Sequence, residues 1–285
     1  MTTGLEIDPA TAVALPVTQW GAPRASRTAL LLHGLSSAGA VWWRVADGLA
    51  AQGFRVVAPD LRGHGDAPRT LRYPLGAFAA DVLRLRPAAV HPAGNAADPV
   101  SEQAAVLWDV VVGHSLGGAV AALALASDAA WARTAVLVDP ALRQPGGTSP
   151  GALAFRQATV AEVEAPDAAA IRAANPDWHP EDVHLKVRAA RQTSRHTIEG
   201  VLDDTAEWDL PPLLERLEVP VAVLGADPAR GAVVSSELGA RLAAANEKLR
   251  YTVVAGAGHS VHRSHPERVV AEVLELTGAS APAAS

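Results

Sequence analysis

The sequence of 285 residues contains no cysteine. Disulfide bonds, thiolate metal sites and a cysteine nucleophile are therefore excluded, although cysteine-free chains occur in both reducing and oxidising compartments. The sequence also lacks a basic excess, because 24 Lys and Arg stand against 30 Asp and Glu, giving a formal charge of -6. A protein that binds nucleic acid through its charge normally carries a basic face, so we expect a small-molecule partner and no nucleic acid.

Long apolar segments are missing as well. Stretches such as 119–126 are far shorter than the roughly 20 residues needed to cross a bilayer, so we expect no membrane partner. The first residues have neither a basic region nor a continuous apolar run, which indicates no secretory signal and predicts a cytoplasmic protein. Hydrophobic residues make up 49% of the chain and charged residues 19%, a balance typical of a globular fold that leaves the oligomeric state open.

Short β-branched runs alternate with Ala/Leu-rich stretches of helical period. Gly, Pro or Asp residues bound the runs, which cover 29–32, 54–58, 110–112, 135–138, 219–224 and 251–254. This alternation predicts an α/β fold with a parallel sheet covered by helices. The runs are continuously apolar, as in strands buried on both faces, so we expect the functional site at their carboxyl ends.

Strand signals stop between residues 141 and 210, where proline and glycine divide the sequence into short helical pieces. We interpret 141–210 as a helical cap inserted into a core formed by 1–140 and 211–278. The irregular segment 87–100 is interpreted as a surface excursion. The tail 279–285 has nothing to bury and is predicted to be disordered.

The most informative segment is Gly113-His114-Ser115-Leu116-Gly117, which follows the apolar run 110–112 and precedes an Ala-rich helical stretch. In a strand, Gly-x-Ser-x-Gly turn and helix of this kind, the serine occupies a strained backbone position and the two glycines allow close approach of strand and helix. The same pattern occurs at 147–151, around Ser149, but no strand precedes it there. Pro150 cannot donate the backbone N–H that an oxyanion site needs, so we interpret Ser149 as a turn residue.

These features resemble the α/β-hydrolase fold family over nearly the whole chain. Segment 30–35, Leu-Leu-Leu-His-Gly-Leu, is similar to the family's loop after the third strand, and 60–65, Asp-Leu-Arg-Gly-His-Gly, resembles its tight turn after the fourth. The resemblance implies a mostly parallel eight-stranded sheet flanked by helices, with the inserted cap. It also implies a Ser115 nucleophile and an oxyanion hole formed by the backbone N–H groups of Leu35 and Leu116.

The resemblance further implies that His259, after the last apolar run, is the general base. We prefer Asp227, after the penultimate run, as the triad acid, and Asp139, after 135–138, is the alternative because some family members take the acid from that strand. His262 and His265 follow at helical spacing without a carboxylate or cysteine cluster, so we expect no metal. The mechanism needs no cofactor. Five further residues are expected to support loops rather than react, namely His33, His64, His114, Asp60 and Asp66.

The sequence thus predicts a serine hydrolase that cleaves a carboxylic ester through an acyl-enzyme. Trp42 and Trp43 are candidate walls of the substrate pocket, with core packing as the competing interpretation. Arg191 and Arg195, in a basic part of the cap, either lie on a solvated helix face or bind a free carboxylate, as in a monoalkyl phthalate half-ester. Alternatives are a C–C bond hydrolase, a lactonase or a perhydrolase with the same triad, and a non-catalytic ligand receptor.

Overall fold

The computed structural model describes residues 4–87, 107–144, 149–204 and 208–279. Within these ranges, seven strands form one sheet in the order β1-β3-β2-β4-β5-β8-β9. Their bounds are β1 Val17–Trp20, β2 Arg27–Leu32, β3 Phe54–Pro59, β4 Val110–His114, β5 Ala135–Val138, β8 Val221–Gly225 and β9 Leu249–Val253. Strand β1 pairs with β3 antiparallel and all other pairs are parallel. The predicted mostly parallel sheet is confirmed, with seven described strands where the resemblance implied eight.

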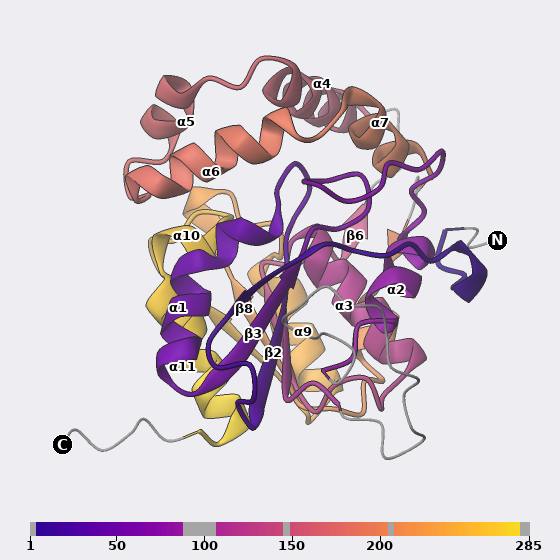
Figure 1. Cartoon of the computed structure of the whole chain (residues 1–285), viewed down its shortest axis with the longest axis vertical. Helices are drawn as coiled ribbons and strands as arrows, with labels where there is room; N and C mark the ends of the chain where they lie inside the picture. Colours follow the sequence, from indigo (N-terminus) through magenta and orange to yellow (C-terminus); the bar gives the residue numbers. More distant parts are fainter. Residues whose placement is uncertain (1–3, 88–106, 145–148, 205–207, 280–285) are drawn as a thin grey trace.

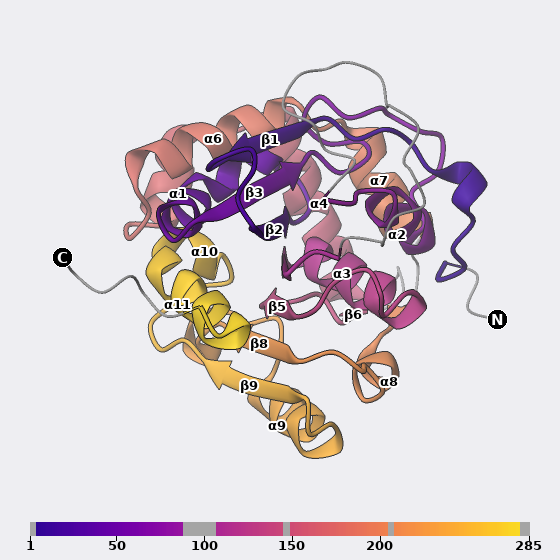
Figure 2. The same cartoon turned by 60° about the horizontal axis from the view of Figure 1, so that its bottom comes forward.

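Helices cover both faces of this sheet (Figures 1 and 2). One face carries α1 Trp43–Ala51, α10 Val261–Ser264 and α11 Pro266–Thr277, and the other carries α2 Leu75–Leu83, α3 Leu116–Ser127, α8 Pro211–Leu214 and α9 Ser236–Ala245. Successive strand residues enter opposite layers: Leu30 and Leu32 belong to one core cluster, and Leu31 to the other. Because both faces are covered, β3, β4, β5 and β8 are buried at every position, which accounts for their uninterrupted apolar runs.

The insertion between β5 and β8 is mostly helical. Its elements are β6 Arg143–Gln144, α4 Pro150–Glu164, α5 Ala168–Ala174, α6 Pro180–Arg191, α7 Arg195–Asp204 and β7 Trp208–Asp209. Helices α4 to α7, here called the cap helices, lie above one end of the sheet in Figure 1. Strands β6 and β7 pair antiparallel, so the chain leaves the core and returns to it at the same place.

Hydrogen bonds fix the cap helices to the core at several places, and two of them involve carboxylates of α7 and α6. In α7, the Asp204 carboxylate accepts from the Tyr73 backbone N–H at 2.6 Å and from Arg72 Nε at 2.9 Å. In α6, Asp182 accepts from the Trp43 indole N–H at 3.0 Å. Because each contact satisfies a polar group that lies largely out of water, the cap is held in a defined position above the sheet.

The turn at 60–65 is held by side chains of the kind expected to support loops. Asp60 accepts from the backbone N–H groups of Gly39 at 2.7 Å and Asp66 at 2.9 Å. His33 Nε2 accepts from the Leu61 N–H at 2.9 Å. These contacts bring the loop after β2 against the loop after β3, at the end of the sheet where the site lies.

Parts of the predicted irregular segment and tail lie outside the described residues. The segment 87–100 is described only at Pro87, and the tail only at Ala279.

Among the helices that the structure describes, none is long and apolar enough to span a membrane. Three short 3-10 helices complete the elements in the described part of the chain: η1 Pro9–Thr11, η2 Gly39–Trp42 and η3 Pro228–Arg230.

Candidate active site

Ser115 occupies the sharp turn between β4 and α3, with φ 51° and ψ -116°. Such a left-handed backbone is strained for a residue with a side chain, and strain of this kind clusters at functional sites. A Cβ on Gly113 would lie 2.4 Å from the Gly117 carbonyl oxygen, and one on Gly117 would lie 2.3 Å from the Leu32 carbonyl oxygen. Only glycine fits at either position, which explains the spacing of the motif.

Leu116 and Leu35, whose amides were predicted to form an oxyanion hole, both lie next to Ser115. Leu116 is the first residue of α3, so its N–H has no acceptor within the helix and lies at the positive end of the helix dipole. Leu35 lines a cavity together with Ser115. The preceding residue, Gly34, passes so close that a Cβ there would lie 3.1 Å from Ser115 Cβ.

His259, in the loop after β9, contacts Asp139. Its Nδ1 lies 2.7 Å from Oδ2 of Asp139, whose side chain is fully buried. The same carboxylate accepts backbone N–H bonds from Val233 at 2.9 Å and Val234 at 3.0 Å. In the neutral tautomer that donates from Nδ1 to the carboxylate, Nε2 of the imidazole is free to accept a proton.

Asp227 lies elsewhere, and the structure thereby corrects the expectation that it contacts His259. Its carboxylate caps η3 by accepting from Ala229 N–H at 2.9 Å and accepts from Gly256 N–H at 2.7 Å. The Gly256 bond is the main reason that the pKa of Asp227 is lowered. Asp227 therefore bonds to the loop that leads to His259, and the carboxylate in contact with the imidazole is that of Asp139.

Strand register explains why Asp139 is in the better position. Val138 pairs with His114, so Asp139 and Ser115 each come one residue after a paired position on neighbouring parallel strands. Asp139 also has a left-handed backbone, with φ 38°. Its position directly after the apolar run 135–138 is the sequence signal that made it the alternative to Asp227.

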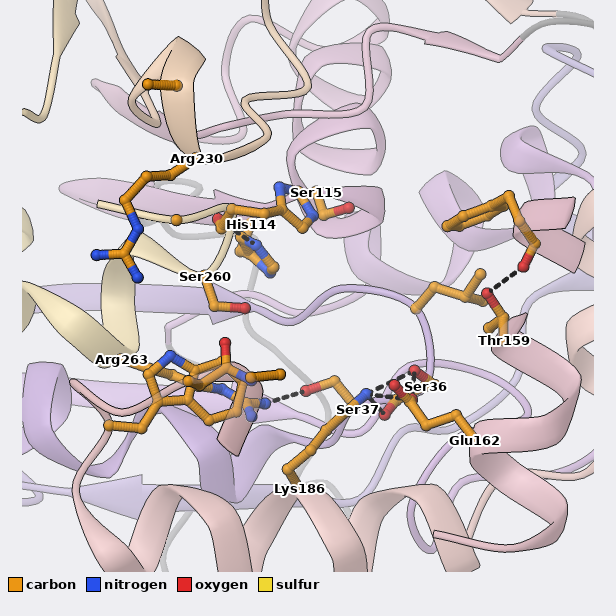
Figure 3. Close-up of a pocket in the computed structure, with 18 residues that line it drawn as sticks. Ser36, Ser37, His114, Ser115, Thr159, Glu162, Lys186, Arg230, Ser260 and Arg263 are labelled. Carbon is orange, nitrogen blue, oxygen red and sulfur yellow. Dashed lines mark hydrogen bonds and ion pairs between the residues drawn. The ribbon is translucent and has the colours of Figure 1, made fainter. Parts of the chain in front are cut away.

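Two cavities meet at Ser115 and His259, and both residues line each of them. The larger has a volume of about 540 Å³ and is polar, and Figure 3 shows Ser115 across it from Lys186. The smaller, of about 290 Å³, is lined mainly by apolar groups such as Phe155 and Leu202. A bound molecule can therefore place a polar part and an apolar part on either side of the serine.

None of the four predicted substrate-binding side chains lines either cavity. Trp42 is fully buried in the core, its ring centroid 4.5 Å from that of His262, because η2 and α1 turn it toward the sheet. Trp43 is bonded to Asp182 of the cap, as described above. Arg191 is exposed, and Arg195 is paired with Glu164 and Glu199 on the outside of the cap.

The charged side chains that do line the larger cavity were not among the residues predicted from the sequence to bind substrate. Arg263 in α10, Lys186 in α6 and Glu162 in α4 come from three separate helices. Lys186 was visible only as one member of a basic run, and Arg263 only as a residue four positions after His259. Nothing in their local sequence indicates that the three meet.

Four other histidines near the site, His33, His64, His114 and His262, are buried. Burial lowers the pKa of His33 to about 4 and that of His64 to about 3. Burial also lowers the pKa of His114 and His262 well below 6.5, so all four are neutral at pH 7. His114 Nε2 lies 3.1 Å from the His259 carbonyl oxygen, which ties the end of β4 to the loop after β9.

Ser149, the serine of the second Gly-x-Ser-x-Gly pattern, is the N-cap of α4. Its hydroxyl accepts from the Ala152 backbone N–H at 3.2 Å. The side chain thus satisfies a free amide at a helix start.

Within the described residues, no group of three or more His, Asp or Glu is placed to hold a metal ion.

A profile of the Alpha/beta hydrolase family matches residues 29–272. This match covers most of the chain, from Ala29 in β2 through β9 and into the first half of α11. The chain therefore belongs to the α/β hydrolase family.

Curated and structural comparisons give relatives within this family. The chain is 33% identical over 133 residues to the lipase LipV of Mycobacterium tuberculosis, covering 46% of this chain and 44% of that protein. It spans less than half the length of the curated relatives it matches. Its fold is similar to a malate-bound thermophilic esterase from Thermogutta terrifontis (TM-score 0.67, 22% identity, 92% of each chain). It is also similar to an esterase from Exiguobacterium antarcticum (TM-score 0.68, 17% identity, 93% of this chain and 95% of that one).

Proposed function

We propose that this protein is a serine hydrolase that cleaves carboxylic esters through an acyl-enzyme, with Ser115 as nucleophile, His259 as general base and Asp139 as the orienting acid. The observation that carries the proposal is the 2.7 Å contact between His259 and the buried Asp139, at the cavity that His259 shares with the strained Ser115. A nucleophile, a base and a group that orients the base are the parts that acyl transfer requires.

The reaction follows from where charge develops. His259 Nε2 takes the hydroxyl proton of Ser115 as Oγ attacks the ester carbonyl, and Asp139 stabilises the imidazolium that forms. The backbone N–H groups of Leu35 and Leu116 stabilise the tetrahedral oxyanion. Collapse expels the alkoxide, which receives the proton from His259 and leaves as the alcohol.

Deacylation repeats these steps with water. His259 removes a proton from water as its oxygen attacks the acyl carbonyl, and the proton then returns to Ser115 Oγ as the carboxylic acid departs. Every proton is passed through one imidazole, so its orientation by Asp139 matters in both halves of the cycle. Asp227 has no role in this scheme other than bracing the loop before His259.

An ester substrate is supported by the relatives as well as by the site. LipV is named a lipase, and the two similar structures are named esterases. The cavity volumes of about 540 and 290 Å³ suit a small ester with one group on each side of Ser115.

The test is turnover of p-nitrophenyl butyrate combined with covalent labelling by a fluorophosphonate. We expect turnover and labelling in the native protein and neither in Ser115→Ala, with thermal unfolding measured to confirm that the variant is folded. Labelling without ester turnover would redirect the proposal to a lactone, a C–C bond or transfer to peroxide. Absence of both labelling and turnover, together with tight ligand binding, would indicate a receptor and refute the proposal.

A further inference from the structure

Arg263 is a buried cation on the wall of the larger cavity. The residue is 3% exposed and lies in α10, directly after the His259 loop. Among the described residues its Nη1 has no hydrogen-bond partner, and its two other contacts are long, both at 3.4 Å, to Ser37 Oγ and His262 Nε2. A guanidinium held out of water without full hydrogen bonding is costly, so the arrangement needs a reason.

The other charged groups that line this cavity are already paired. The Lys186 ammonium bonds to Glu162, and the Glu162 carboxylate also accepts from Ser36 Oγ at 2.7 Å. Arg230 Nη1 lies 2.7 Å from an Asp177 carboxylate oxygen. Three cations and one anion line the cavity, and of these Arg263 is the cation without a paired carboxylate in the described structure.

Asp182 is the nearby carboxylate that could compete for Arg263. It does not line the cavity, and it accepts from the Trp43 indole N–H at 3.0 Å. Its second oxygen lies 3.9 Å from Arg44 Nη1 and makes no hydrogen bond in the described structure. The Asp182 charge thus opposes the lowering of the Arg263 pKa, but no ion pair between the two side chains is formed in the described structure.

The guanidinium is also held in place and remains charged. Its carbon lies 4.4 Å from the centroid of the Trp178 ring, a cation–π contact that fixes the plane of the fork. Burial lowers the pKa of Arg263 to about 10, and the Asp182 and Glu162 charges oppose that shift. The side chain is therefore a cation at neutral pH. Figure 3 shows it on the side of the cavity away from Ser115, next to Ser37.

We propose that Arg263, with the Ser37 hydroxyl beside it, binds a free carboxylate of the substrate, so that the preferred substrate is a monoester of a dicarboxylic acid. This inference rests on the proposed ester hydrolysis. The planar fork can bind a carboxylate through two parallel hydrogen bonds, which satisfies Nη1 and neutralises the buried charge. The carboxylate occupies the polar cavity, the scissile ester lies at Ser115, and the alcohol group occupies the smaller apolar cavity. Arg263 takes the role that the sequence suggested for Arg191 or Arg195.

The first experiment compares kcat/KM for mono-p-nitrophenyl glutarate and for its neutral methyl ester. The native protein is expected to prefer the acid, and Arg263→Met is expected to lower the acid-to-neutral ratio by about 10- to 100-fold, the range for hydrogen bonds to a charged group. Arg263→Lys, which keeps the charge but loses the fork, should fall between the two. Arg216→Met is the matched control, because Arg216 is exposed and precedes β8 at the opposite end of the sheet, and it should leave the ratio unchanged.

A second measurement does not depend on catalysis. Calorimetry of glutarate and of glutaramide with the native protein should show binding of the diacid, weaker binding of the diamide, and loss of the difference in Arg263→Met. Neutral-ester turnover without preference for the acid, or no difference between glutarate and glutaramide, would overturn the carboxylate site while leaving ester hydrolysis intact. Glutarate binding without turnover of either ester would instead refute the hydrolase and retain the anion site.

Discussion

Asp139 and Ser115 lie at the same level of the sheet on neighbouring strands, each one residue past the pair formed by Val138 and His114. Both have a left-handed backbone, so both leave their strands in a sharp turn at the same edge. His259 lies in the loop after β9 and contacts the Asp139 carboxylate. Because parallel strands end at one edge, Asp139 and His259 lie together there although they are 24 and 144 positions after Ser115 in the chain.

We expect Asp139→Asn to lower kcat by about 10³- to 10⁴-fold, because the amide no longer stabilises the imidazolium or selects its tautomer. Asp227→Asn, the matched carboxylate-to-amide change, should lower kcat less than tenfold, since Asp227 only braces the loop before His259. Steady-state kinetics with p-nitrophenyl butyrate measures both variants. A larger loss in Asp227→Asn than in Asp139→Asn would return the acid to position 227.

Gly117→Ala should destabilise the fold and abolish activity. The new Cβ would lie 2.3 Å from a backbone carbonyl oxygen, so the strand and helix around Ser115 would have to separate. Gly151→Ala is the control, because its Cβ would meet nothing within 4 Å and alanine favours the helix by roughly 1 kcal/mol. Thermal unfolding should show a large decrease for the first variant and a small increase for the second. Equal melting temperatures would contradict the close approach at Gly117.

Substitutions of the two Gly-x-Ser-x-Gly serines, Ser115 and Ser149, should have different effects on labelling and on stability. Ser149→Ala removes the N-cap of α4 and should cost about 1 kcal/mol in the free energy of unfolding while labelling by a fluorophosphonate continues. Ser115→Ala should retain its stability and lose the label. Mass spectrometry of the labelled peptide identifies the modified serine. Modification of Ser149 in the native protein would contradict the proposal that Ser115 is the nucleophile.

The buried histidines should make the protein less stable in acid. The pKa of His33 is lowered to about 4 and that of His64 to about 3, against about 6.5 in the unfolded chain. At a pH between the folded-state pKa and 6.5, the unfolded state binds more protons than the folded state. The free energy of unfolding therefore decreases as pH falls below 6.5. Each histidine contributes a slope of up to about 1.4 kcal/mol per pH unit. Above pH 7 both states are neutral and the contribution disappears.

Urea unfolding at pH 7.5, 6 and 5 measures this slope. His64→Asn should reduce it, and His184→Asn, which changes an exposed histidine in α6, should not. An unchanged slope in His64→Asn would show that His64 does not resist protonation in the folded protein.

Local sequence predicted the parts of the site that depend on local backbone geometry. The strand, turn and helix around Ser115 were predictable because no larger residue can replace the two glycines of the motif. The loops that carry Leu35 and His259 were predictable because each comes after an apolar run and contains glycine. The same patterns predicted the α/β architecture and the inserted helical region. Ser149, which shares the motif, could be set aside because no β-branched apolar run directly precedes it in the sequence.

The amino-acid sequence by itself determined the elements, their order and the chemistry available at the strand ends, because glycine sterics, apolar periodicity and residue type act over a few neighbouring positions. Only the tertiary structure decided that Asp139 rather than Asp227 meets His259, that Trp42 packs in the core, and that Arg263 enters the cavity beside Ser115. Those outcomes depend on strand register and on which helix covers which face, and these are set by packing between residues far apart in the chain.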